Sequence, residues 1–333
     1  MPDTDRDRRK SSIQREPWNS LFGLCVVTGL VWTCAASPAF AAKDAEGTDG
    51  PTVNIVPRES RSQTARDRGT GTIRLDVKAI LVPVTVTDAR DRPVQGLGKE
   101  SFRIFEDNVE QEIISSSIED TPASVGVIFD ASGSMESKIT PSVDAVEQFF
   151  RTTLPGDEFL LVRFADKPQF MGGFTPDIMQ VSAWLHSMRA AGWTALNDAI
   201  YLGIQKMKTA KNTRKVILVL SDGGDNNSRY STREIRSLVR ESGVSIYSIS
   251  FYQGSRLLES VSDETGGRLI HVHHLSELPD AIEKLSRAIR NQYVLSYYSS
   301  NSQNDGKYHR VRVELSQPAM RLSWRHGYYA PLD

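Results

Sequence analysis

The sequence predicts an α/β domain with a doubly wound, mostly parallel sheet, inserted into a small β-sandwich-like unit. In the middle of the chain, short apolar runs alternate with amphipathic stretches of helical period, which is typical of parallel strands covered by helices on both faces. On either side of this region, apolar residues recur with period two and no helical pattern separates them, which is typical of antiparallel strands. Because a few isolated strands make a poor core, we expect the two flanking segments to fold together.

The composition excludes several classes of protein. With 333 residues, the chain is long enough for one large domain and one smaller domain. A hydrophobic fraction of 39% and a charged fraction of 24% exclude a protein with many membrane spans and a wholly disordered chain. The 40 basic and 41 acidic residues nearly cancel, and no basic run is interleaved with aromatic residues, so we expect no nucleic-acid partner.

Residues 1–41 have the organisation of a cleaved signal peptide. A basic, polar start is followed by the apolar run Leu21–Ala36 and by small residues at Ala39 and Ala41. We therefore expect an exported protein that is periplasmic, secreted or at the cell surface. The alternative is an uncleaved anchor, because the apolar stretch approaches the roughly 20 residues that span a bilayer, and this anchor is the only membrane contact that we expect. Both cysteines, Cys25 and Cys34, lie in the leader, so a cleaved chain has no disulfide or thiolate site.

Residues 42–72 are predicted to be a disordered linker, because they are rich in charged and small polar residues and cannot bury enough apolar surface to offset the entropy of ordering. The β unit begins with residues 73–120. Apolar residues alternate from Ile73 to Val86, with a break at Pro83. Two further apolar runs follow, at 102–105 and 113–118. We expect these segments to be the first strands of the β unit.

Residues 121–291 are predicted to form the α/β domain. The expected strands are 125–129, 159–164, 216–220 and 244–251. The expected helices are 138–153, 178–189, 196–208, 232–242 and 278–290. The charged residues Glu283, Lys284, Arg287 and Arg290 are predicted to form the exposed face of the last helix. Residues 292–333 return to a strand pattern and complete the β unit, with expected strands at 293–298, 308–315 and 320–324.

Oxygen-bearing side chains follow two of the predicted α/β strands. Asp130 ends the first strand, and Ser132 and Ser134 follow it on a glycine-containing loop. Asp222 follows the strand 216–220, and Thr194 lies in a glycine loop before a predicted helix. Ligands of doubly wound sheets bind at the carboxyl ends of the strands, and hard divalent cations take oxygen ligands. The pattern therefore predicts one divalent metal site at this edge of the sheet.

The central region resembles the von Willebrand factor type A family, whose metal site has the form Asp-x-Ser-x-Ser, then a Thr, then an Asp. The matching residues occur in the family's order at Asp130, Ser132, Ser134, Thr194 and Asp222. The resemblance implies a Rossmann-type fold, an Mg²⁺ ion (or Mn²⁺ or Ca²⁺) as cofactor, and a protein partner that supplies an Asp or Glu carboxylate. The flanking segments 81–88 and 326–329 resemble a bacterial exported subgroup of the family.

The leading hypothesis is a metal-dependent adhesion or protein-interaction module that is not an enzyme. One alternative is a metal-assisted hydrolase, although no Ser/His/Asp arrangement and no phosphate-binding glycine loop accompany the predicted metal ligands. Another alternative is a structural envelope protein whose metal site engages no ligand. Two further features stay open: His271, His273 and His274 are either a transition-metal site or polar residues on a strand, and Trp193 either anchors a partner or packs in the core.

Overall fold

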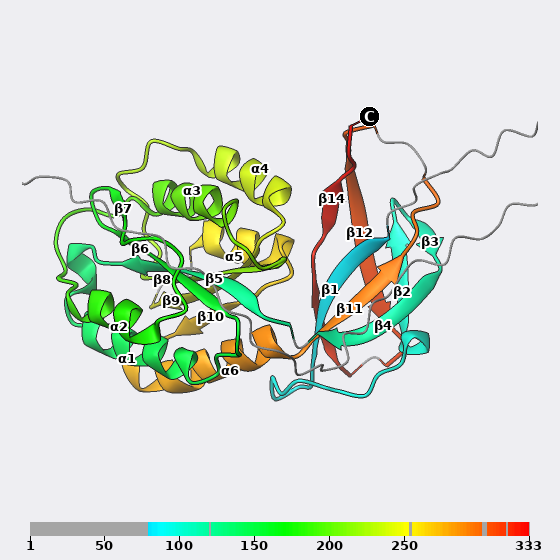
Figure 1. Cartoon of the computed structure of the whole chain (residues 1–333), viewed down its shortest axis with the longest axis horizontal. Helices are drawn as coiled ribbons and strands as arrows, with labels where there is room; N and C mark the ends of the chain where they lie inside the picture. The colour runs from blue at the N-terminus through cyan, green and yellow to red at the C-terminus, as the bar shows by residue number, and fades with distance from the viewer. Residues whose placement is uncertain (1–78, 120, 253–254, 302–304, 318, 333) are drawn as a thin grey trace, which may run out of the picture. The chain divides into compact units, whose positions relative to one another are not determined.

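The central part of the chain is built on a six-stranded sheet with the strand order β10-β9-β8-β5-β6-β7 (Figure 1). The strands are β5 (Ala123–Asp130), β6 (Glu158–Phe164), β7 (Pro168–Phe170), β8 (Arg214–Ser221), β9 (Ser245–Phe251) and β10 (Leu269–Val272). All neighbouring strands are parallel except β6 and β7, which are antiparallel. The predicted doubly wound, mostly parallel sheet is therefore confirmed. The computed structural model describes residues 79–119, 121–252, 255–301, 305–317 and 319–332.

Helices cover both faces of this sheet (Figure 1). They are α1 (Ile139–Phe150), α2 (Ile178–His186), α3 (Leu196–Met207), α4 (Thr232–Ser242), α5 (Arg256–Glu264) and α6 (Leu278–Arg290). The apolar sides of α1, α2 and α6 share one buried cluster, and those of α3, α4 and α5 share another. Strand β5 is buried along its whole length and contributes Val127 and Phe129 to the first cluster and Ile128 to the second. Burial on both faces explains why the sequence of this strand is continuously apolar.

Local sequence signals set several helix ends. The carboxylate of Asp177 caps α2 by accepting hydrogen bonds from the backbone N–H groups of Met179 and Gln180. Helix α4 begins with a reciprocal capping box between Ser231 and Glu234 and ends at Gly243, whose φ of 71° is left-handed. These caps supply partners for backbone groups that have none within the helix.

The β unit combines strands from both sides of the α/β domain. One sheet has the order β13-β1-β11-β4 and the other β14-β12-β2-β3. The strands are β1 (Ile80–Thr87), β2 (Phe102–Glu106), β3 (Val109–Gln111), β4 (Ile113–Glu119), β11 (Gln292–Tyr297), β12 (Tyr308–Leu315), β13 (Arg321–Trp324) and β14 (Gly327–Tyr329). Apolar residues of both sheets share one core, to which Val84, Ile104, Leu295 and Val313 belong. The sandwich-like arrangement of early and late strands therefore agrees with the sequence prediction.

Strand β1 differs from the prediction at Pro83, where the sequence indicated a break. The strand continues through Pro83, which lies opposite Val294 of β11. Proline is tolerated in a strand where its missing N–H is not needed by a neighbour. The pairing of β1 with β13 begins only at Val84, so Pro83 lies beyond the end of that ladder.

The predicted leader and linker lie outside the described residues, as does the start of the first predicted strand, from Ile73 to Lys78. Within the part of the chain that the structure describes, no helix is both long enough and apolar enough to cross a membrane.

Candidate metal centre

Asp130 is held rigidly at the carboxyl end of β5. Its side chain is fully buried, and both carboxylate oxygens accept hydrogen bonds. Oδ1 accepts from the backbone N–H of Ser132 at 2.9 Å, and Oδ2 accepts from the hydroxyl of Ser221 at 2.6 Å. Burial raises the pKa of Asp130, and the nearby charge of Asp222 raises it further, while the two serines oppose the shift. The ionised carboxylate is therefore in a position where a nearby cation stabilises it.

The two serines of the loop after β5 bring their hydroxyl oxygens to within 3.2 Å of each other. Ser132 is buried, whereas Ser134 lies on the exposed side of a short 3-10 turn, Gly133–Met135. The backbone N–H of Gly133 donates to the carbonyl of Gly192 at 3.0 Å. This bond fastens the serine loop to the loop that carries Thr194.

The Thr194 loop is shaped by a glycine and an aspartate. Gly192 has a φ of +81°, and a Cβ there would lie 2.6 Å from the carboxylate of Asp166, so only glycine fits. Asp166 Oδ1 accepts a hydrogen bond from the backbone N–H of Trp193 at 2.7 Å. Thr194 is buried, and its backbone N–H donates to Asn226 Oδ1 at 2.9 Å. The loop is thus joined to the segment that follows Asp222.

Asp222 follows β8, the neighbour of β5 in the sheet, and its Oδ2 lies 3.0 Å from the ammonium group of Lys138. Lys138 also donates to the backbone carbonyl of Ser134 at 2.5 Å. Its side chain is only 8% exposed. The structure therefore brings Asp130, the serine loop and Asp222 together. The buried ammonium group of Lys138 lies between the serine loop and Asp222.

Sequence reasoning did not identify Lys138 or Ser221 as parts of this network. Ser221 directly precedes Asp222 at the end of the predicted strand, so its position was a usable signal. Lys138 lies four residues after Ser134, and its return to the Ser134 carbonyl depends on the 3-10 turn. That turn could not be derived from residue spacing.

The arrangement fits a hard divalent cation. Two carboxylates and the hydroxyls of serine and threonine side chains are oxygen ligands of the kind that Mg²⁺, Mn²⁺ and Ca²⁺ prefer. Burial and the charge of Asp222 both raise the pKa of Asp130, so a cation beside Asp130 would stabilise its ionised form. Lys138 already places one positive charge against Asp222, which shows that this carboxylate is positioned to pair with a cation.

Known proteins resemble the central part of the chain. Residues 125–224 match the family described as von Willebrand factor type A domain. The match lies within the α/β domain, and its range includes all five predicted oxygen ligands, from Asp130 to Asp222. Inter-alpha-trypsin inhibitor heavy chain H4 of Homo sapiens is 22% identical over 201 residues, which are 54% of this chain and 22% of that protein. Its Bos taurus counterpart is 22% identical over 233 residues, which are 64% of this chain and 25% of that protein. The chain thus spans about a quarter of the length of these relatives.

Two solved structures are also similar to part of the chain. A von Willebrand factor type A protein from Catenulispora acidiphila has a TM-score of 0.47 at 11% identity, covering 77% of this chain and 74% of that one. Proximal thread matrix protein 1 from the mussel byssus, with a zinc-occupied MIDAS motif, has a TM-score of 0.47 at 18% identity, covering 55% of this chain and 50% of that one.

Two exposed aromatic side chains lie near the loops of the α/β domain. Trp193 is 64% exposed beside Thr194, which excludes core packing for this residue. Tyr252, which follows β9, is 51% exposed, and its ring centroid lies 5.3 Å from the Lys138 ammonium. Both rings are therefore available to a molecule that approaches the oxygen cluster.

The three histidines of β10 and the segment that follows it have, among the described contacts, none with the loops of the oxygen cluster. His271, His273 and His274 are all exposed. The backbone N–H groups of His273 and His274 donate to Glu277 Oε2 at 2.9 and 3.4 Å. The described contacts of this segment thus fix a turn before α6, and they favour the interpretation of the histidines as polar surface residues.

Proposed function

We propose that the mature chain is an exported, non-catalytic interaction module that binds one divalent ion, Mg²⁺ in the first instance or else Mn²⁺ or Ca²⁺, and through it an Asp or Glu carboxylate of a protein partner. The proposed metal ligands, direct or through water, are Asp130, Ser132, Ser134, Thr194 and Asp222. The observation that carries the proposal is the network that joins Asp130, the two serines and Asp222 at the ends of adjacent parallel strands.

The chemistry of the ligands supports binding of a further carboxylate. When bound, a divalent ion supplies an electrophilic centre that a partner's carboxylate can reach by replacing water. Ser132, Ser134 and Thr194 offer neutral hydroxyls, so the protein supplies only the charges of Asp130 and Asp222. The hydrogen bonds from Ser221 and from the Ser132 backbone keep the Asp130 oxygens oriented toward the loop.

The surroundings of the cluster suit a protein partner. Exposed Trp193, beside Thr194, and exposed Tyr252, near Lys138, provide large, rigid apolar surfaces. Aromatic side chains are enriched among the residues that contribute most to protein interfaces. In this arrangement the two rings contact the partner and exclude water, and the oxygen cluster provides specificity for a carboxylate.

The export of the chain is part of the proposal and rests on the leader in residues 1–41. Detection of full-length protein with its original Met1 only in the cytosol would contradict it. A cleaved chain recovered from the envelope or the medium is the expected result.

Metal binding is tested by calorimetry with Mg²⁺ and Mn²⁺ on purified mature protein. We expect one equivalent to bind, and Asp130→Asn, which preserves the size of the side chain, to weaken binding by more than about 100-fold, because loss of even an outer-shell partner costs about 10- to 100-fold. Asp144→Asn is the matched control, since Asp144 is an exposed residue of α1. Equal metal binding by all three proteins would refute the assignment.

Partner binding is tested by pull-down from envelope extract with wild-type protein, Asp130→Asn and Asp144→Asn, each with and without EDTA. The proposal expects protein capture that EDTA and Asp130→Asn both abolish. Capture that neither treatment changes would refute a metal-dependent module. Turnover of generic ester or phosphate substrates by wild-type protein with Mg²⁺, lost in Asp130→Asn, would favour the hydrolase instead.

A further inference from the structure

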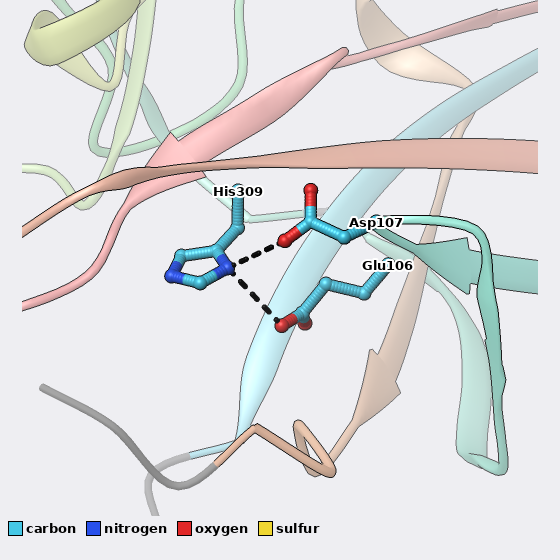
Figure 2. Close-up of side chains that lie close together, drawn as sticks. All are labelled: Glu106, Asp107 and His309. Carbon is cyan, nitrogen blue, oxygen red and sulfur yellow. Dashed lines mark hydrogen bonds and ion pairs between the residues drawn. The ribbon is translucent and has the colours of Figure 1, made fainter. Parts of the chain in front are cut away.

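A second group of metal-ligating side chains lies in the β unit, away from the proposed oxygen cluster. Glu106 ends β2, Asp107 begins the turn to β3, and His309 lies on β12, which pairs with β2. Figure 2 shows the imidazole facing both carboxylates. His309 Nδ1 lies 2.8 Å from Asp107 Oδ2 and 3.7 Å from Glu106 Oε1, and the three ligand atoms lie within 4.8 Å of one another.

The remaining polar atom of each residue is held by a different group. Glu106 Oε2 accepts hydrogen bonds from the hydroxyls of Tyr297 at 2.7 Å and Tyr328 at 3.1 Å. Asp107 Oδ1 accepts from the backbone N–H of Arg310 at 2.9 Å. His309 Nε2 lies 3.4 Å from Asp305 Oδ1. These contacts fix the orientation of all three side chains, so that Nδ1, Oε1 and Oδ2 converge.

The negative charge of the buried Glu106 carboxylate needs a positive charge beside it. The side chains of Glu106 and His309 are only 3% and 6% exposed, and a buried carboxylate is costly unless it is paired. Ser299 donates a further hydrogen bond to Glu106 Oε1 at 2.6 Å, but a hydroxyl carries no positive charge. The cation is either a proton on His309 or a metal ion.

We propose that Glu106, Asp107 and His309 bind a divalent transition-metal ion of the Zn²⁺ class. Ligands about 2.1 Å from a tetrahedral Zn²⁺ are about 3.4 Å apart, so the separations of 2.8 and 3.7 Å from His309 Nδ1 need only small shifts. The Glu106 and Asp107 oxygens lie within 4.8 Å of each other. The side chain of Asp107 is 47% exposed, which leaves the fourth position open to water. The imidazole nitrogen distinguishes this site from the oxygen cluster of the α/β domain, because imidazole favours Zn²⁺ and its neighbours over Mg²⁺ and Ca²⁺.

Asp305 completes the arrangement as an outer partner. A histidine that binds a metal through one ring nitrogen commonly donates its other N–H to a carboxylate, which fixes the tautomer and raises the basicity of the ligand. His309 Nε2 and Asp305 Oδ1 have this relation. Asp305 itself is held by the ammonium group of Lys307 at 2.9 Å.

Metal binding here fastens the β unit together. Glu106 and His309 belong to one sheet, while Tyr297, which donates to Glu106, lies on β11 in the other sheet. An ion on Glu106, Asp107 and His309 therefore links the β2–β3 turn to β12 and, through Tyr297, the two sheets. Because binding occurs only in the folded state, it stabilises the β unit by mass action.

The test is Zn²⁺ titration of the full mature chain against a chelator of known affinity, in the Asp130→Asn background so that the oxygen cluster does not contribute. We expect one equivalent of Zn²⁺, a loss of more than about 100-fold in affinity for His309→Gln, and a loss of about 10- to 100-fold for Asp305→Asn. His271→Gln, at an exposed histidine elsewhere, is expected to bind like the parent.

Two readouts keep the proposal open to refutation if a variant folds poorly. Circular dichroism in EDTA identifies variants that have lost their fold, and Co²⁺ in place of Zn²⁺ reports tetrahedral coordination by its visible absorption. Absence of Zn²⁺ uptake in the Asp130→Asn parent would overturn the proposal. So would equal uptake by a folded His309→Gln variant, or loss of uptake in His271→Gln.

Discussion

The ammonium group of Lys138 lies between the carbonyl of Ser134 and the carboxylate of Asp222, so a side chain of the domain itself neutralises one proposed metal ligand. A divalent ion at the same carboxylate is repelled by this charge. At about 4 Å and an effective dielectric constant of 20, two unit charges interact by about 4 kcal/mol. Movement of the flexible lysine side chain relieves most of this repulsion. Lys138 is thus an internal competitor for the metal position.

We therefore predict that Lys138→Met raises Mg²⁺ affinity by about 10-fold, because the variant removes the part of the repulsion that movement of the lysine does not relieve. In EDTA the same variant is expected to be less stable by about 1–3 kcal/mol, because Asp222 loses its charged hydrogen-bond partner. Calorimetry measures the first effect and urea unfolding the second. Lys167→Met is the control, since Lys167 is exposed on a nearby loop. Weaker or unchanged Mg²⁺ binding in Lys138→Met would contradict the prediction.

At this scale the sequence identified residues by type and spacing but could not identify their contacts. Asp130 and Asp222 were recognisable because each follows an apolar strand, and parallel strands end at one edge of a sheet. The cluster of Glu106 with His309 joins residues about 200 positions apart through β2 and β12 pairing. No local pattern in the sequence specifies that register.

At the scale of elements, helices α4 and α5 are joined through Glu264. Its carboxylate accepts hydrogen bonds from Arg236 Nε and Arg240 Nε, each at 2.9 Å, and from the Ser260 hydroxyl at 3.0 Å. The Glu264 side chain is only 10% exposed. Burial pushes its pKa upward, but the hydrogen bonds from Arg240, Arg236 and Ser260 outweigh burial, and the pKa is lowered.

A lowered pKa in the folded state gives the sign of the pH dependence. The contribution of Glu264 to stability is complete above its unfolded pKa of about 4.3 and is lost as the pH falls through the lower folded value. We predict that Glu264→Gln lowers the free energy of unfolding by about 1–3 kcal/mol at pH 7 and by less near pH 3. Urea unfolding at several pH values measures this. Glu259→Gln on the exposed side of α5 is the control, and a difference that stays constant with pH would contradict the prediction.

Elements with long, regular patterns were predicted, and short ones were missed. Five of the helices agree with the sequence to within a few residues, because their apolar residues recur at helical spacing. Helix α5 was not predicted, since its nine residues bury only a few apolar side chains, among them Leu257, Leu258 and Val261. Strand β7 was missed for the same reason: three residues beginning with Pro168 carry no readable period.

At the scale of the whole described region, Asp157 connects the two points where the chain passes between the β unit and the α/β domain. Its Oδ1 accepts a hydrogen bond from the backbone N–H of Ala123, where β5 begins. Its Oδ2 forms an ion pair with Arg290, the last residue of α6, at 2.5 Å. The prediction that Arg290 lies on an exposed helix face was wrong, since its side chain is only 11% exposed. The sequence did not indicate this burial, because the partner carboxylate of Asp157 lies far from Arg290 in the chain.

The junction after α6 is short and well packed. Asn291 alone separates α6 from β11, and the Gln292 side chain donates to the Tyr247 hydroxyl of β9 at 2.8 Å. A short, stiff connection passes displacement on instead of absorbing it. If metal binding moves α6, β11 and its neighbour β1 move with it. By reciprocity, the state of the β unit then changes metal affinity, typically by about 1–3 kcal/mol where such coupling exists.

This coupling predicts the effect of inserting a flexible Gly/Ser segment between Arg290 and Asn291. We expect Mg²⁺ to slow hydrogen exchange of the β1 amides, Ile80–Thr87, in the wild-type protein and not in the insertion variant, and the insertion to change Mg²⁺ affinity. An equal insertion after Gly96, where a side chain would meet open space, is the control and should preserve both effects. Equal protection of β1 in both insertion variants would exclude α6 as the route. If Mg²⁺ leaves β1 exchange unchanged in the wild-type protein, the β unit is a stalk that carries the metal-binding domain without responding to it.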